Sequence, residues 1–237
     1  MQLINENLMK KTLIVIAFLF GANLAYGQNQ AIENSEPKKD KFRWGFTFLN
    51  VWSNVEGNTP DTYTKPSLGG NVKVEYFPLD FLGFTAGVGY QQRGYGLTLP
   101  DTGFVAPSMN TYRNRIRMNS VEFPLGVILK TPKPLGGGST WLMASVGVSP
   151  LYMFEANDVY LSVEDGFHVV KDVTSSFNQS DMPIFVSIGP EIDTSAGFFQ
   201  VQLIGSFGTS EVYSTSNNPN GYSGKNKYLG FSIGCTF

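Results

Sequence analysis

The sequence predicts an all-β protein: an eight-stranded antiparallel up-and-down β-barrel that spans a membrane. Three observations predict it. Apolar and polar residues alternate in eight segments, the connections between these segments are short and long in turn, and the last segment alternates up to Phe237. Beyond residue 27 no apolar run approaches the ~18 residues of a membrane-spanning helix, so strands are expected to make the crossing.

In the first four segments, about 43–54, 66–77, 82–96 and 115–130, one face is apolar and the other is small or polar. The apolar faces are Trp44, Phe46, Phe48 and Trp52; Leu68, Val72, Val74 and Tyr76; Leu82, Phe84, Ala86, Val88 and Tyr90; and Val121, Phe123, Leu125, Val127 and Leu129. A strand with one lipid-facing side and one lumen-facing side has this period of two.

The last four segments, about 140–154, 183–193, 197–208 and 227–237, follow the same pattern. Their apolar faces are Leu142, Ala144, Val146 and Val148; Ile184, Val186, Ile188 and Ile192; Phe199, Val201, Leu203 and Phe207; and Leu229, Phe231, Ile233, Cys235 and Phe237. Eight is an even number of strands, as in bacterial outer-membrane barrels.

The connections give the orientation. Those after the second, fourth and sixth segments are short (78–81, 131–139 and 193–196), whereas the others are long (roughly 55–65, 97–114, 155–182 and 209–226). Outer-membrane barrels have short periplasmic turns and long outer loops, so both chain ends are expected on the periplasmic side. The connection 155–182 could hide a further hairpin (160–163 with 168–173), which would either project from the rim or make the barrel ten-stranded.

The amino-terminal region has the three parts of a secretory signal peptide: Lys10 and Lys11, the apolar run 13–20, and Ala25-Tyr26-Gly27 as a cleavage site. We therefore expect residues 1–27 to be a cleaved signal peptide, 28–42 a flexible periplasmic lead-in, and 43–237 the barrel. The predicted location is the outer membrane of a Gram-negative cell.

Composition argues against several functions. The formal net charge is −2 and no basic stripe is present, so no nucleic-acid partner is expected. One cysteine, Cys235, and one histidine, His168, cannot form a disulfide framework or a zinc cluster. His168 has no serine or aspartate at a spacing that would enforce a catalytic pair, so we predict no catalytic residues, no cofactor and no metal.

The predicted lumen face carries charged residues, which are Lys73, Glu75, Arg93, Glu122 and Glu191. An eight-stranded barrel is just filled by its own side chains, and charges buried there need partners. We favour a packed ion-pair network; the other interpretation is a proton relay or a narrow ion path.

Aromatic residues lie near the predicted strand ends and suggest girdles at the two membrane interfaces. They are Trp44, Phe77, Phe81, Trp141, Phe198 and Phe237 at the periplasmic end, and Trp52, Tyr90, Tyr152 and Tyr228 at the outer end.

Two details of the fourth segment need explanation. Arg115 and Arg117 share the parity of lipid-facing Val121, so either a bulge near Asn119 shifts the register or both stand above the membrane, which we favour. Pro124 cannot donate to the ladder, so we expect a gap there.

Three stretches resemble the PorT-like outer-membrane β-barrel family. Residues 74–77 with 82–94 (VEYF and LGFTAGVGYQQRG) resemble its "GlxYxxkG" strand, residues 120–125 (SVEFPL) its "YLEIPL" strand, and residues 229–237 (LGFSIGCTF) its closing "lxlGyxF" strand. The resemblance implies that the closing strand, with Phe231, Ile233 and Phe237, is the insertion signal read by the barrel-assembly machinery. It implies no catalytic residues.

Together these features predict a non-enzymatic outer-membrane barrel that acts as a scaffold or binds a protein partner through its outer loops or periplasmic rim. The resemblance links this role to protein secretion. The expected partners are outer-membrane lipid, the assembly machinery during insertion, and a protein. The alternatives are a narrow transport or signalling channel and, less favoured, a lipid-modifying enzyme.

Overall fold

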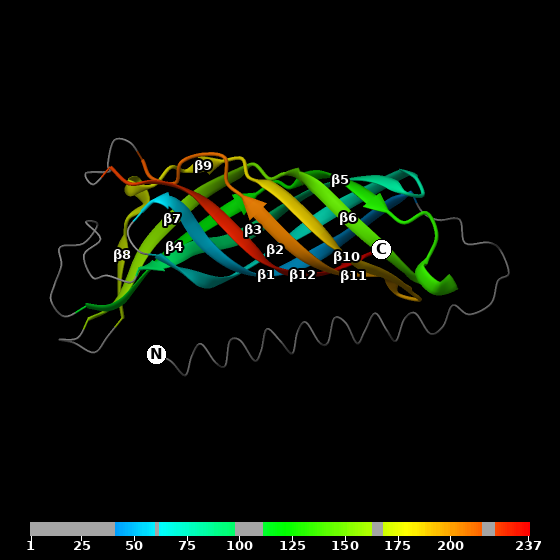
Figure 1. Cartoon of the computed structure of the whole chain (residues 1–237), viewed down its shortest axis with the longest axis horizontal. Coiled ribbons are helices and arrows are strands. Elements are labelled where there is room, and N and C mark those ends of the chain that lie inside the picture. Colours follow the sequence, from blue (N-terminus) through cyan, green and yellow to red (C-terminus); the bar gives the residue numbers. More distant parts are fainter. Residues whose placement is uncertain (1–40, 60–61, 98–110, 163–167, 215–220) are drawn as a thin grey trace.

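The computed structural model describes residues 41–59, 62–97, 111–162, 168–214 and 221–237. The expected signal peptide and nearly all of the lead-in lie outside the described residues. The elements, shown in Figure 1, are β1 (Phe42–Asn58), β2 (Thr62–Leu79), β3 (Leu82–Leu97), β4 (Thr111–Glu122), β5 (Leu125–Lys130), η1 (Leu135–Gly137), β6 (Thr140–Val148), β7 (Leu151–Ser162), β8 (His168–Asp172), η2 (Thr174–Ser176), β9 (Ser180–Asp181), β10 (Ile184–Thr194), β11 (Gly197–Phe207) and β12 (Ser223–Thr236).

The strands close into one antiparallel ring. β12 pairs with β1 from Gly45↔Thr236 to Asn58↔Ser223, and β2 pairs with both β1 and β3. β3 pairs along its length first with β5 and then with β4, so β4 and β5 form one wall strand, and β6 with β7 forms another. The ring therefore has eight strand positions, and the predicted eight-stranded barrel is confirmed.

Prolines interrupt the wall strands. The gap between β4 and β5 falls at Phe123 and Pro124, and the gap between β6 and β7 at Ser149 and Pro150. The N–H of Phe123 donates to the Pro150 carbonyl at 2.8 Å, and the N–H of Ser149 donates to the carbonyl of Pro183 at 2.8 Å. The gap expected at Pro124 is thus confirmed, and the carbonyl of a proline in a neighbouring strand accepts one hydrogen bond at each of the two gaps.

A hairpin extends beyond the ring. β7 continues past the barrel wall and pairs with β8 from Asn157↔Asp172 to Leu161↔His168. Among the described residues β8 pairs with no other strand, and Figure 1 shows it at the end of the barrel opposite η1. The hairpin predicted within 155–182 exists, but it projects from the rim and the ten-stranded alternative is wrong.

The outer face of the ring is apolar, as the alternation predicts. Leu68 and Leu229, for example, are 63% and 64% exposed although both are leucine. Glu75 and Glu191 point the other way and are 1% and 0% exposed. Among the described residues no helix has the length and hydropathy needed to cross a bilayer.

The aromatic girdles are only partly present. Trp44, Phe81, Trp52, Tyr90 and Tyr152 are exposed on the outer face. In contrast, Phe77, Trp141 and Tyr228 are buried, so their assignment to the girdles is wrong. Trp141 and Tyr228 each precede an outward leucine, and strand parity turns them inward whatever their affinity for an interface.

The pairing of β4 with β3 has no register shift from Asn114 to Glu122. The irregularity lies on the partner strand, where Asn119 pairs with Glu155 and the next residue, Ser120, pairs with Met153. Arg115 and Arg117 therefore share the outer face with Val121 but stand beyond it toward the outer end. The expectation that they lie above the membrane is favoured over a bulge in their own strand.

Candidate functional site: the lumen and its outer mouth

The half of the lumen nearer to η1, at the end expected to be periplasmic, is organised around one carboxylate. Glu191 of β10 is fully buried and pairs with two cations, Arg43 of β1 and Lys130 of β5. Arg43 Nη1 lies 3.3 Å from Glu191 Oε1, and Lys130 Nζ contacts the same oxygen. Three strands that are distant in the chain are thus joined across the lumen by one acidic side chain.

Gln200 of β11 extends this cluster to a second carboxylate. Its Nε2 donates to Glu191 Oε2 at 2.9 Å and lies 3.3 Å from Glu75 Oε1. Lys73 Nζ lies 2.8 Å from Glu75 Oε1 and donates to Gln200 Oε1 at 2.5 Å. Buried charges are costly unless paired and hydrogen-bonded, and each member of this cluster has such partners.

Aromatic rings cover the two cations. The Arg43 guanidinium lies 3.4 Å from the Phe198 ring centroid and 4.8 Å from that of Phe77. Lys130 Nζ lies 4.3 Å from the centroid of the Trp141 ring. We call these residues, with the ion pairs of Glu191 and Glu75, the periplasmic plug. The inward aromatics thus have cation–π contacts in the lumen instead of an interfacial position.

A second ion pair lies toward the outer end. Arg93 Nη2 of β3 is 2.7 Å from Glu122 Oε1 of β4, and both side chains are buried. Ser149 Oγ donates to Glu122 Oε2 at 2.9 Å. The Arg93 guanidinium also lies 5.2 Å from the Tyr228 ring centroid.

A polar cavity of about 70 Å³ lies in the lumen beside these groups. Its lining includes Asn71, Lys73, Glu75, Glu122, Ser145, Ser149, Ser187, Gln202 and Ser232, together with apolar Leu49, Ile128, Met143 and Phe185. This volume holds a few water molecules rather than a continuous aqueous channel.

The outer mouth is closed by apolar side chains from two connections. Val173 and Phe177 come from the segment after β8, and Val212 and Tyr213 from the segment after β11. All are at most 5% exposed. They pack with side chains of the barrel wall, which are Val55, Tyr95, Leu97, Ile116, Met118, Met153 and Ala156. We call residues 173–178 and 209–213 the lid.

Hydrogen bonds join the two segments of the lid. The N–H of Asn178 donates to the Val212 carbonyl at 2.8 Å, and its Nδ2 donates to the Tyr213 carbonyl at 3.1 Å. The Phe177 and Tyr213 ring centroids are 5.6 Å apart. Tyr213 Oη donates to Tyr95 Oη of the wall at 3.0 Å. The lid is therefore anchored to itself and to the barrel.

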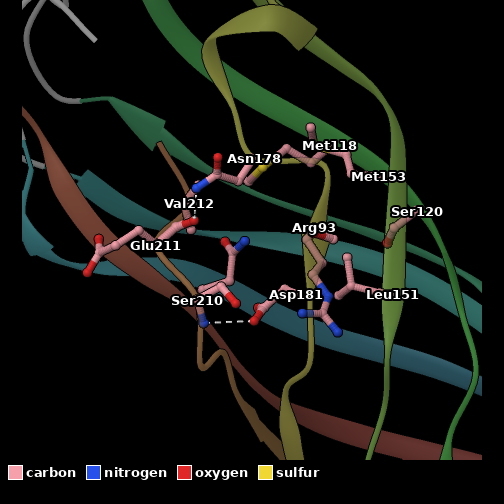
Figure 2. A pocket seen from close by; sticks show the side chains of 12 residues that line it. Arg93, Met118, Ser120, Leu151, Met153, Asn178, Asp181, Ser210, Glu211 and Val212 are labelled. Atoms are coloured by element: carbon pink, nitrogen blue, oxygen red, sulfur yellow. Dashed lines mark hydrogen bonds between the residues drawn. The ribbon is translucent and has the colours of Figure 1, made fainter. Parts of the chain in front are cut away.

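Asp181 fastens the edge of the lid. Its Oδ1 accepts the backbone N–H groups of Thr209 at 3.1 Å and Ser210 at 2.9 Å. Figure 2 shows the Ser210 bond as a dashed line, with Arg93 of the wall beside it. Arg93 and Asp181 line a residual cavity of about 20 Å³ under this edge.

One buried carboxylate beneath the lid has no hydrogen-bond partner among the described residues. Asp158 of β7 is 0% exposed, and neither of its oxygens accepts a hydrogen bond in the described part of the chain. It pairs across the sheet with Ile116, whose side chain belongs to the apolar mouth. Burial raises the pKa of Asp158 to about 6, and the nearby Lys171 offsets this only in part.

The five lumen charges taken from the sequence are distributed over three ion-pair groups. Lys73 pairs with Glu75 and Arg93 with Glu122, but Glu191 pairs with Arg43 and Lys130, which sequence reasoning missed. The alternation of inward and outward residues along each strand would have placed both cations in the lumen. Arg43 immediately precedes the outward Trp44, and Lys130 immediately follows the outward Leu129.

Within the described residues no three histidine, cysteine, aspartate or glutamate side chains come together as a metal site. Cys235 is half-buried on the outer face of β12. Its position on this face agrees with the contact with lipid that the sequence pattern predicts. His168 begins β8 in the rim hairpin.

A protein-family model described as the outer membrane protein beta-barrel domain matches residues 26–214. A comparison with curated proteins finds no match. Among solved structures, the chain is similar to Ail, the attachment invasion locus protein of Yersinia pestis, at 11% identity and a TM-score of 0.41, over 83% of this chain and 99% of that chain. It is similar to OprG of Pseudomonas aeruginosa at 10% identity and a TM-score of 0.44, over 83% and 94%. It is also similar to Neisserial surface protein A at 9% identity and a TM-score of 0.42, over 83% and 97%.

Proposed function

Because this chain belongs to the outer membrane protein beta-barrel family and is thereby placed in the outer membrane, we propose that it is a closed, non-conducting barrel that works by binding a protein partner. The partner contacts its outer loops or periplasmic rim. The PorT-like motifs of the sequence suggest a role linked to protein secretion.

The obstruction of the lumen at two levels carries this proposal. The lid covers the outer mouth with buried Phe177 and Tyr213, and the periplasmic plug fills the other half with paired charges and aromatic rings. A conducting path would have to displace both. A barrel closed in this way offers its surfaces rather than its interior to a partner.

Conductance in planar bilayers tests the proposal. We expect the refolded protein to show no steady single-channel current at neutral pH. Steady currents that disappear in Glu122→Ala would instead support the alternative, a narrow transport or signalling channel. That alternative is favoured by the polar cavity in the lumen, which Glu122 lines.

Site-specific photo-crosslinking in cells tests partner binding. A crosslinking amino acid at Leu135, in the exposed periplasmic turn η1, probes one rim, and one at Lys225 probes the other. Leu68, on the lipid face, is the matched control. We expect a discrete protein adduct at one rim and none at Leu68. If neither rim gives an adduct, the partner-binding role is wrong. Unchanged lipid A in a deletion strain would separately exclude the lipid-modifying enzyme.

We also propose that β12 carries the insertion signal. Phe231 and Ile233 are exposed on its outer face, at 48% and 47%, and Phe237 packs against Trp44 of β1 with ring centroids 5.2 Å apart. Deletion of Phe237 should lower the amount of heat-modifiable barrel in the membrane. Phe207→Ala, which removes an exposed aromatic side chain of β11, is the control and should not affect assembly.

A further inference from the structure

Arg93 of the barrel wall lies near two carboxylates, Glu122 in the lumen and Asp181 at the edge of the lid. We propose that Arg93 exchanges between these two partners and that this exchange couples the lid to the lumen. When Arg93 turns from Glu122 to Asp181, the lid edge is bound more tightly to the wall. This inference concerns the closure of the outer mouth and does not depend on partner binding.

The Arg93 guanidinium uses only part of its hydrogen-bonding capacity. Its Nη2 donates to Glu122 Oε1 at 2.7 Å, whereas its Nε is buried and has no hydrogen-bond partner among the described residues. A guanidinium carries several N–H donors in a planar fork, so it can bind a second anion from another side. A buried donor without an acceptor is destabilising, which favours a second partner for Arg93.

Asp181 has an acceptor that the lid does not use. Its Oδ1 accepts the backbone N–H groups of Thr209 and Ser210, and the Thr209 hydroxyl lies 3.3 Å from the same oxygen. Its Oδ2 is buried and has no hydrogen-bond partner in the part of the chain that the structure describes. Asp181 therefore holds the lid through one oxygen and leaves the other available to a cation of the wall.

The residual cavity of about 20 Å³ under the lid edge gives Arg93 room to move. Arg93 and Asp181 both line this cavity, as does Asn226, whose Oδ1 is also buried without a hydrogen-bond partner among the described residues. Figure 2 shows the Arg93 side chain next to Asp181 at this place. The volume has room for about one water molecule, so the guanidinium can approach Asp181 without displacing the wall strands.

The two carboxylates compete for the same cation. The negative charges of Glu122 and Asp181 both attract the Arg93 guanidinium. In the described structure Arg93 forms its ion pair with Glu122 and not with Asp181. A buried cation needs an anion, so removal of the charge of Glu122 would leave Asp181 as the carboxylate that attracts Arg93.

Glu122 has other polar neighbours when Arg93 turns away. Ser149 Oγ donates to Glu122 Oε2 at 2.9 Å, and Glu122 lines the polar lumen cavity together with Lys73. The exchange therefore does not leave a carboxylate buried among apolar groups alone. Because Glu122 faces the lumen cavity and Asp181 holds the lid, the partner that Arg93 takes connects the two regions.

Amide hydrogen exchange of the refolded full-length protein in detergent tests the proposal. Glu122→Gln removes the charge but keeps hydrogen-bonding groups, so Arg93 should turn to Asp181. Exchange in 209–213 should then become slower by about two- to fivefold, the range for one partly exposed ion pair. In an Asp181→Asn background, Glu122→Gln should not change exchange in this segment. Glu75→Gln neutralises another buried lumen carboxylate, so it is the matched control and should leave 209–213 unchanged.

The sign of the effect distinguishes an exchange of partners from simple support of the wall. If Glu122 only stabilised the wall, its neutralisation would make exchange in 209–213 faster. Faster or unchanged exchange in Glu122→Gln would therefore overturn the proposal. Equal slowing with and without Asp181→Asn would do the same, because the effect would not pass through Asp181. The heat-dependent gel shift checks that each variant is folded.

A second measurement does not require Glu122→Gln to fold. The NMR signal of the Arg93 Nε–H group in isotope-labelled protein reports the surroundings of this group, and Arg93→Lys assigns it. In Asp181→Asn, a change at the lid edge, the signal should shift and its proton should exchange faster with water. Asp172→Asn, at an exposed carboxylate of β8, is the control and should leave the signal in place. A signal that Asp181→Asn leaves unchanged would show that Asp181 does not reach Arg93.

Discussion

The two ends of the lumen are closed by opposite means. The periplasmic plug is built from charges on rigid strands, and Glu191, Arg43 and Lys130 satisfy one another. The lid is built from apolar side chains on connections, and the buried carboxylate beneath it, Asp158 of β7, is left without a hydrogen-bond partner in the described residues. Strands in fixed register can hold ion pairs at hydrogen-bonding distance. A lid made of connections relies on apolar burial, which needs no precise geometry.

The largest effect is expected where the plug is broken. Glu191→Ala leaves Arg43 and Lys130 buried without their common anion, and the removal of one partner from a buried pair costs about 3–5 kcal/mol. The urea midpoint of the refolded barrel should fall sharply. The midpoint of Glu191→Gln, which keeps hydrogen-bonding groups but not the charge, should fall less. An unchanged midpoint in Glu191→Ala would mean that the plug does not stabilise the barrel.

Removal of a lid side chain should act locally. Phe177 is 3% exposed, and its replacement by alanine should cost the lid about 3–5 kcal/mol, the usual range for a buried phenylalanine. Amide hydrogen exchange should rise in 173–178 and 209–213 but stay unchanged in β1 and β12. Exchange that rises equally around the ring would show that lid and barrel are one cooperative unit and would weaken the comparison.

Replacement of Asp158, which has no hydrogen-bond partner among the described residues, should increase the stability of the lid, whereas the two substitutions above decrease stability. The pKa of Asp158 is about 6 in the closed mouth and near 3.8 when solvated, so the closed state binds the proton more tightly. The closed lid is therefore most stable below about pH 4, loses stability as pH rises from 4 to 6, and stays at the lower value above that range. Asp158→Asn should stabilise the lid at pH 7.5 by up to roughly 3 kcal/mol.

Hydrogen exchange of the lid, corrected for the intrinsic rate, measures this effect. Protection in wild type should fall between pH 4 and 6, and the pH dependence should disappear in Asp158→Asn. A variant that keeps the wild-type pH dependence would assign the titration to another group.

The smallest effect is expected at an exposed ion pair. Lys227 Nζ lies 2.7 Å from Glu56 Oε2 on the outer face, but both side chains are well exposed. Solvent screens such pairs, so Lys227→Ala should change stability by at most about 1 kcal/mol. It therefore serves as the surface reference for Glu191→Ala, and a comparable loss in both would contradict the importance of burial.

The barrel wall was predictable because apolar and polar residues alternate with a period of two in every wall strand. That same parity places Glu75, Arg93, Glu122 and Glu191 inside, and it would also have placed Arg43. The side chains that aromatic preference assigned to the interface, such as Trp141, were the ones for which parity was the better guide.

The lid was not predictable from the sequence. Phe177 and Tyr213 lie in connections without periodicity, and nothing local indicates that two loops separated by more than thirty residues meet above the lumen. Their burial depends on the ring beneath them. Asp158 was missed for a related reason, because its segment reads as part of a long loop until β8 is seen to pair with it.

The pairing of β1 with β12 has a kinetic consequence. Gly45 and Thr236 are neighbours in the closed ring although 191 residues separate them in the chain. Contacts of such high sequence separation form late, because the entropy of closing a long loop must be overcome before they are made. Until then β1 and β12 each present an unpaired edge, so the stage before closure is when this chain is most prone to aggregate.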